Sequence, residues 1–106
     1  MPDLNLNIKL SYLYRDAGNY KQFGDIVFNN PENFTLDEIN AKLKSLLIDG
    51  EYFVATQWQI PTLYTFPFDE ELDHTWHEFE SLTSTREKAT DERSISEFIN
   101  HLCQQA

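Results

Sequence analysis

The sequence has little cysteine, glycine or proline, and it has no long apolar run. Its single cysteine, Cys103, leaves no partner for an internal disulfide, and the first five residues lack the basic region and cleavage site of a secretory signal. No apolar stretch approaches the roughly 20 residues that are needed to cross a bilayer. We therefore expect a cytoplasmic protein that does not enter a membrane.

Basic residues are also scarce. Eight Lys and Arg stand against 18 Asp and Glu, which gives a formal net charge of −10. Such a charge repels the phosphates of nucleic acids and the head groups of anionic lipids, so the sequence argues against direct binding to nucleic acid or to a membrane. Residues 66–106 hold ten acids and three bases, so we expect a basic partner to meet this part of the chain.

The chain nevertheless has enough apolar surface to form a core. It has 106 residues, of which 41% are hydrophobic and 14% aromatic. This length is close to that of one ordinary domain. We expect residues 1–106 to fold as a single domain.

Residues 4–28 have the pattern of a β-hairpin. The even positions from Leu4 to Tyr14 are apolar and the odd ones are mostly polar, which is the period of a half-buried strand. A turn is expected at residues 15–19, which include a glycine and an asparagine, and residues 20–28 are again rich in aromatic and β-branched types. Pro31 should end the second strand.

Two helices are expected, and both carry the same N-terminal signal. Thr35 with Glu38, and Ser94 with Glu97, fit the capping box, in which side chain and backbone of the two residues bond reciprocally. Apolar residues follow each box at helical spacing. Gly50 is expected to end the first helix.

The remaining segments favour two more strands. Residues 51–60 and 74–83 are rich in aromatic and β-branched side chains, and residues 62–72 have the composition of a long loop. The predicted order is strand, strand, helix, strand, strand, helix. This order predicts an α+β fold, a two-layer sandwich in which the helices cover one face of an antiparallel sheet.

The densest polar cluster lies in residues 69–80. It holds six carboxylates, two of the three histidines and a tryptophan, without one Lys or Arg. Protein interfaces combine acids that attract a basic partner with aromatic side chains that supply buried contact area. We therefore predict a partner-binding surface that comprises Asp69, Glu70, Glu71, Asp73, Glu78, Glu80, Trp76 and Tyr64.

These features predict a non-enzymatic, acidic protein-binding module without a cofactor. It would dock a basic macromolecule, most simply a basic protein, as inhibitors, immunity proteins and adaptors do. Mimicry of nucleic acid by the acidic surface is an open variant of this hypothesis. Because the net charge opposes self-association, we expect a monomer or a weak dimer.

The alternative hypothesis is a small metal-dependent or His/carboxylate hydrolytic enzyme. Asp73, His74, His77 and Glu78 offer two imidazoles and two carboxylates of a type that zinc or manganese accepts. In a helix the two histidines would share a face, whereas in a strand they would point to opposite faces. The surrounding residue types favour a strand, and hence structural histidines. A third hypothesis is an aromatic pocket for a small ligand, made of Tyr12, Tyr14, Tyr52 and Trp58.

Four segments together resemble a family of small uncharacterised bacterial proteins. They are residues 12–21 (YLYRDAGNYK), 48–53 (IDGEYF), 72–79 (LDHTWHEF) and 90–94 (TDERS). The resemblance extends over most of the chain and implies a free-standing bacterial protein of one domain. That family has no activity to transfer, so the resemblance assigns no role to any residue.

Overall fold

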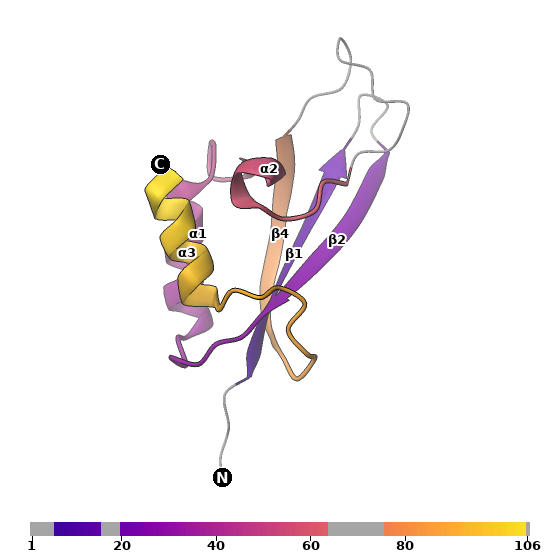
Figure 1. Ribbon diagram of the computed structural model, residues 1–106. Coiled ribbons are helices and arrows are strands. Elements are labelled where there is room, and N and C mark those ends of the chain that lie inside the picture. The colour runs from indigo at the N-terminus through magenta and orange to yellow at the C-terminus, as the bar shows by residue number, and fades with distance from the viewer. Residues whose placement is uncertain (1–5, 16–19, 64–75, 106) are drawn as a thin grey trace.

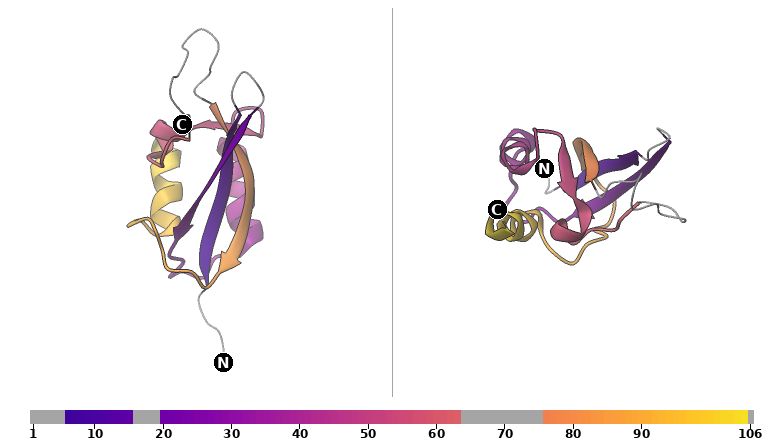
Figure 2. Two further views of the ribbon diagram at one scale, coloured as in Figure 1. Left: turned by 90° about the vertical axis from the view of Figure 1, so that its right-hand side faces the viewer. Right: turned by 90° about the horizontal axis from the view of Figure 1, so that it is seen from above.

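Four strands form one antiparallel sheet in the computed structural model, which describes residues 6–15, 20–63 and 76–105. The strand order in the sheet is β2-β1-β4-β3. Two long helices lie next to each other on the same side of the sheet (Figures 1 and 2). The elements in chain order are β1 (Asn7–Arg15), β2 (Lys21–Phe28), α1 (Leu36–Leu46), β3 (Tyr52–Val54), α2 (Ala55–Trp58), β4 (Trp76–Thr85) and α3 (Ile95–Gln105).

The predicted α+β class is therefore confirmed. The predicted element order is wrong, because the short helix α2 lies between the third and fourth strands. The sheet is curled, and the two-layer sandwich remains a prediction. No helix in the part of the chain that the structure describes is long and apolar enough to span a membrane.

The N-terminal hairpin has the predicted form. β1 and β2 pair from Ile8 opposite Phe28 to Arg15 opposite Lys21. The even positions of β1 point to the core, and their side chains, from Ile8 to Tyr14, are at most 2% exposed. The period of two in the sequence thus defines which face of the hairpin the helices cover.

Both capping boxes form as predicted. The Glu38 N–H donates to the Thr35 hydroxyl at 3.1 Å, and the Thr35 N–H donates to the Glu38 carboxylate at 2.9 Å. Ser94 and Glu97 repeat this arrangement at the start of α3, at 3.2 and 2.8 Å. The expected end of α1 is wrong, because the helix ends at Leu46 and Gly50, with a φ of 72°, lies in the turn before β3.

The predicted strand over residues 51–60 is wrong after Val54. Only β3 is extended, and residues Ala55–Trp58 form α2. One helical turn brings Ala55 and Trp58 to the same side, where both are buried, whereas in a strand they would point to opposite faces. Trp58 stacks on Phe53 with ring centroids 4.2 Å apart, and this contact favours the turn over the extended chain.

The last strand overlaps the predicted range of residues 74–83, extends two residues further, to Thr85, and contains a bulge. Ser11 pairs with Ser81 but Tyr12 pairs with Phe79, so Glu80 is an extra residue in β4. The bulge shifts the alternation of the strand. Phe79 and His77 consequently lie on the face that the helices cover.

Candidate functional site

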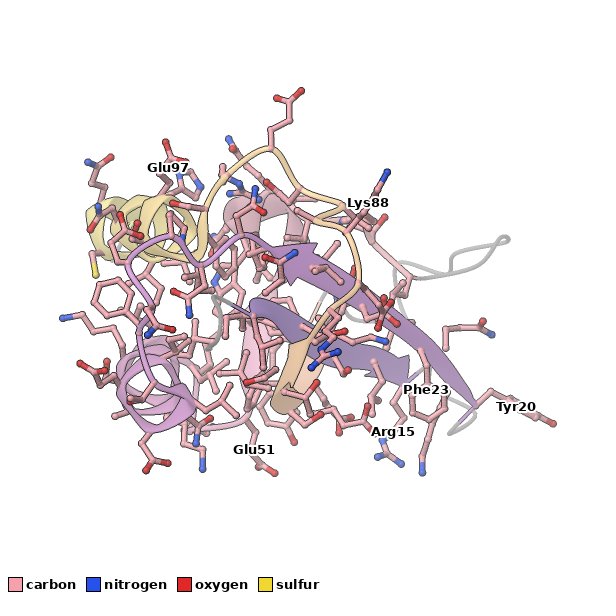
Figure 3. All side chains as sticks on the ribbon, turned by 90° about the horizontal axis from the view of Figure 1, so that it is seen from below. Arg15, Tyr20, Phe23, Glu51, Lys88 and Glu97 are labelled. Atoms are coloured by element: carbon pink, nitrogen blue, oxygen red, sulfur yellow. The ribbon has the colours of Figure 1, made fainter. Side chains whose placement is uncertain are left out.

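One face of the sheet is not covered by the long helices. Tyr52, Glu78, Leu13 and Phe23 form a row across all four strands on this side. Trp76 and Arg15 lie two residues further along β4 and β1, and therefore on the same face. Figure 3 shows Arg15 and Phe23 on the side away from α1 and α3. We call this surface the open face, and it comprises Leu13, Arg15, Phe23, Tyr52, Trp76 and Glu78.

The open face carries large aromatic side chains. Trp76 is 40% exposed and stacks on Tyr52, with ring centroids 5.4 Å apart and planes inclined by 30°. Phe23, on the other side of the row, is 63% exposed. Exposed aromatic side chains in one patch are typical of surfaces that bind other proteins.

An ion pair lies in the middle of the open face. The Arg15 Nε donates to the Glu78 carboxylate at 2.9 Å, and a second guanidinium nitrogen donates to it at 3.4 Å. This bond raises the pKa of the Arg15 guanidinium above its usual value. The positive charge of Arg15 compensates the negative charge of Glu78, which therefore contributes less to a negative field than the sequence suggests.

A hollow of about 490 Å³ lies beside this pair. Its lining combines the stacked rings of Tyr52 and Trp76 with Arg15, Glu78 and Glu51. Among the described residues, Glu51 has no ion-pair partner, so it adds a full negative charge to the hollow. Figure 3 shows Glu51 between α1 and Arg15. The hollow is thus aromatic on its walls and acidic at its rim.

The predicted binding residues fall into two groups. Trp76 is on the open face, Glu78 is paired with Arg15, and Glu80 is an exposed residue at the bulge of β4. The others lie outside the described residues: Tyr64, Asp69, Glu70, Glu71 and Asp73.

Four residues of the open face and of the hollow beside it were not predicted from the sequence as binding residues. Arg15, Phe23, Glu51 and Tyr52 are brought to Trp76 by strand pairing and by the turn before β3. A signal was present in β1, because Arg15 is an odd position and the odd positions point away from the core. Which side chains of the other strands join them depends on the register, which the sequence does not specify.

His77 is enclosed by the core. Its exposure is 0%, and its ring lies 5.1 to 6.0 Å from the rings of Tyr14, Phe53 and Tyr12. The Leu63 N–H donates to Nε2 of His77 at 3.0 Å, so this nitrogen carries no proton and its lone pair is occupied. The ring therefore acts here as a packed, hydrogen-bonded structural residue.

The structure does not bring His77 and Glu78 together. They are consecutive residues of β4 and point to opposite faces, one into the core and one to the open face. Asp73 and His74, the other members of the predicted metal site, lie outside the described residues. Within the described ranges, no group of three or more His, Cys, Asp or Glu side chains could hold a metal ion.

The proposed aromatic pocket for a small ligand is wrong as a set. Tyr12, Tyr14 and Trp58 are 1%, 2% and 6% exposed, so they are part of the core. The Tyr12 hydroxyl donates to the Pro61 carbonyl at 2.8 Å, which occupies its polar end. Tyr52 lies apart from them, on the open face.

No protein-family model matches the chain, and no curated protein and no solved structure is significantly similar to it. Membership of a family of small bacterial proteins therefore stays a prediction. What the protein binds has to follow from the geometry and the charge of its own surface.

Proposed function

We propose that this chain is a non-enzymatic, acidic protein-binding module that docks a basic protein in the cytoplasm. The observation that carries the proposal is the stacked pair of Trp76 and Tyr52 on the open face, beside the carboxylate of Glu51. An exposed tryptophan on a rigid strand offers a large contact area at a low entropic cost. Inhibitors, immunity proteins and adaptors use such an anchor.

The charge of the chain supports a basic partner. The formal net charge is −10, and the acids of residues 69–73 directly precede Trp76 in the sequence. Carboxylates near an aromatic anchor attract a basic protein and orient it before the anchor is buried. In this proposal Asp69, Glu70, Glu71 and Asp73 supply the field, whereas Glu78 holds Arg15 in place.

Capture experiments with matched variants test the proposal. Wild type, Trp76→Ala and Phe34→Ala are immobilised, exposed to bacterial lysate at low salt and eluted with a salt gradient. Phe34 is a suitable control, because it is 37% exposed, close to the 40% of Trp76, and it lies at the start of α1. We expect a basic protein that wild type and Phe34→Ala capture alike and that Trp76→Ala binds about thirtyfold more weakly, the effect of losing one central anchor.

A second pair of variants tests the acidic run. Glu70→Gln, Glu71→Gln and Asp73→Asn are combined in one variant, and Glu32→Gln, Asp49→Asn and Glu92→Gln in its control, so that the net charge is equal. Binding should weaken much more in the first variant, and it should fall with salt because exposed charges are screened within about 10 Å at 0.1 M. Equal binding by both charge variants, or affinity that does not change with salt, would show that the proposed docking surface is wrong.

A further inference from the structure

Among the described residues, one edge of the sheet is open along the second half of β4, from Ser81 to Thr85. The neighbouring strand β3 has three residues and pairs with Trp76–Glu78, and the Phe79 N–H then donates to the Glu51 carbonyl at 2.9 Å. Between Ser81 and Thr85, β4 pairs only with β1 among the residues that the structure describes. An exposed edge of this kind is a template for another extended chain.

The hydrogen-bond pattern identifies the backbone groups at this edge. The Val27 N–H donates to the Thr90 hydroxyl and the Val27 carbonyl accepts from the Thr90 N–H, so both groups point away from β1. Lys9 of β1 is paired with Val27 and therefore makes no backbone hydrogen bond to it. The N–H and C=O groups of Lys9 point instead to β4, where they face Thr83. Since successive residues alternate, the N–H and C=O groups of Leu82 and Ser84 point to the open edge.

A groove accompanies this edge. It has a volume of about 520 Å³ and lies between α1 and β4, with the turn at Gly50 at one end. Leu36, Phe79 and Leu82 provide an apolar floor, because all three are only partly buried against the core. In Figure 2, β4 is on the side of the sheet where α1 lies. Together, the unpaired backbone groups and the apolar floor fit a strand with alternating side chains.

The charges around the groove indicate what kind of extended segment it would bind. Asp37, Glu51 and Glu80 line it, against a single cation, Lys44. None of these acids forms an ion pair within the described part of the chain. A second copy of this chain, with its formal charge of −10, would be repelled, whereas a basic segment would be attracted.

We propose that this groove binds an extended basic segment of the partner by β-strand addition to the edge of β4. The proposal rests on the proposed function and names how that partner is held. Alternate apolar side chains of the segment pack on Leu36, Phe79 and Leu82, and its backbone bonds to Leu82 and Ser84. Lys and Arg at the intervening positions meet the acids around the groove.

Ser84 allows a direct test of the backbone contact. Ser84→Pro removes the N–H that faces the open edge without removing a bond to β1, and its side chain is exposed. Ser84→Ala keeps the N–H and is the matched control. The probe is a synthetic heptapeptide that alternates valine and lysine, compared with a heptapeptide of the same composition in which the valines are adjacent.

We expect the alternating peptide to bind wild type and Ser84→Ala alike. Ser84→Pro should bind it about fivefold more weakly, the effect of one lost hydrogen bond, and the rearranged peptide should bind weakly to all three proteins. Nuclear magnetic resonance of the wild-type protein gives an independent measure that needs no variant. When the alternating peptide is added, the backbone amide signals of Leu82 and Ser84 should change their chemical shift, and these amide hydrogens should exchange with solvent more slowly.

Equal binding by Ser84→Pro and Ser84→Ala overturns strand addition, and so does a peptide that leaves the Leu82 and Ser84 amides unchanged. A wild-type dimer in sedimentation that Ser84→Pro abolishes would make the occupant a second copy, which also overturns it. The two proposals fail separately. If wild type and Ser84→Pro capture the same basic protein equally while Trp76→Ala does not, the docking module stands and strand addition is wrong.

Discussion

The two faces of the sheet share the same four strands and have opposite properties. On the covered face, Leu10 and Tyr12 are at most 1% exposed and belong to the same buried cluster as residues of both long helices. On the open face, Phe23 and Trp76 are exposed and an ion pair joins Arg15 to Glu78. The covered face therefore accounts for the stability of the fold, and it leaves the open face free to carry side chains suited to binding.

Two phenylalanines of β2 test this comparison with the largest expected effect. Phe28 is 0% exposed and stacks on Phe98 with centroids 4.4 Å apart, whereas Phe23 is 63% exposed. Phe28→Ala should lower the free energy of unfolding by about 3–5 kcal/mol, because it leaves a cavity. Phe23→Ala should lower it by about 0.5 kcal/mol or less. Urea denaturation followed by circular dichroism measures both, and similar losses would contradict the assignment of the faces.

Two consecutive residues of β4 sharpen the comparison. His77→Ala should lower the free energy of unfolding by about 2–4 kcal/mol, because it removes a buried ring and leaves the Leu63 N–H without an acceptor. Glu78→Gln should lower it by less than about 1 kcal/mol, since the ion pair with Arg15 is partly exposed. The same denaturation experiment applies. A His77→Ala protein with unchanged stability would make His77 a candidate for chemistry again, as the enzyme hypothesis requires.

The pH dependence of stability tests the covered face alone. Burial, with a smaller effect of Asp25, raises the pKa of the Tyr12 hydroxyl to about 12. In the unfolded chain this pKa is about 10. The stabilisation is therefore complete below pH 10 and is lost as the pH rises to 12, by about 2–3 kcal/mol in total.

Tyr12→Phe is the control for this measurement. At neutral pH it should be about 1 kcal/mol less stable than wild type, because the hydrogen bond to the Pro61 carbonyl is lost. Above pH 10 the stability of wild type should fall to that of Tyr12→Phe and below it by pH 12, since phenylalanine has no proton to lose and the loss of about 2–3 kcal/mol exceeds the initial difference of about 1 kcal/mol. Curves that stay parallel from pH 8 to 12 would show that Tyr12 does not cause the alkaline loss.

Much of the fold could be predicted from local sequence patterns. The period of two over residues 4–14 predicted the first strand and its buried face, and both capping boxes predicted a helix start to the residue. These signals depend on residues that are a few positions apart. The structure of residues 51–60 could not be predicted in this way, because Trp58 is placed by its contacts with Phe53 and Phe98.

The candidate site could be predicted only in part. Trp76 stood out because acids precede it in the sequence, but Tyr52 is brought to it by the pairing of β3 with β4. Glu78 was expected to be a free acid, and the structure pairs it with Arg15, 63 positions away. The open edge of β4 follows from where β3 begins, because its first residue, Tyr52, pairs with Glu78 and the chain before it turns at Gly50 instead of continuing beside residues 81–85.

The sequence by itself determined the hairpin, the two capped helices and the excess of acid. Each of these features depends on composition or on contacts between residues close in the chain. Alternation of apolar residues, capping motifs and the count of charges indicate them directly in the sequence. Only the tertiary structure decided that His77 is enclosed, that Glu78 is paired with Arg15 and that β4 keeps one edge open. The physical reason is that each depends on strand register and on packing between distant segments, and a register shift of one residue would turn every one of these side chains to the other face.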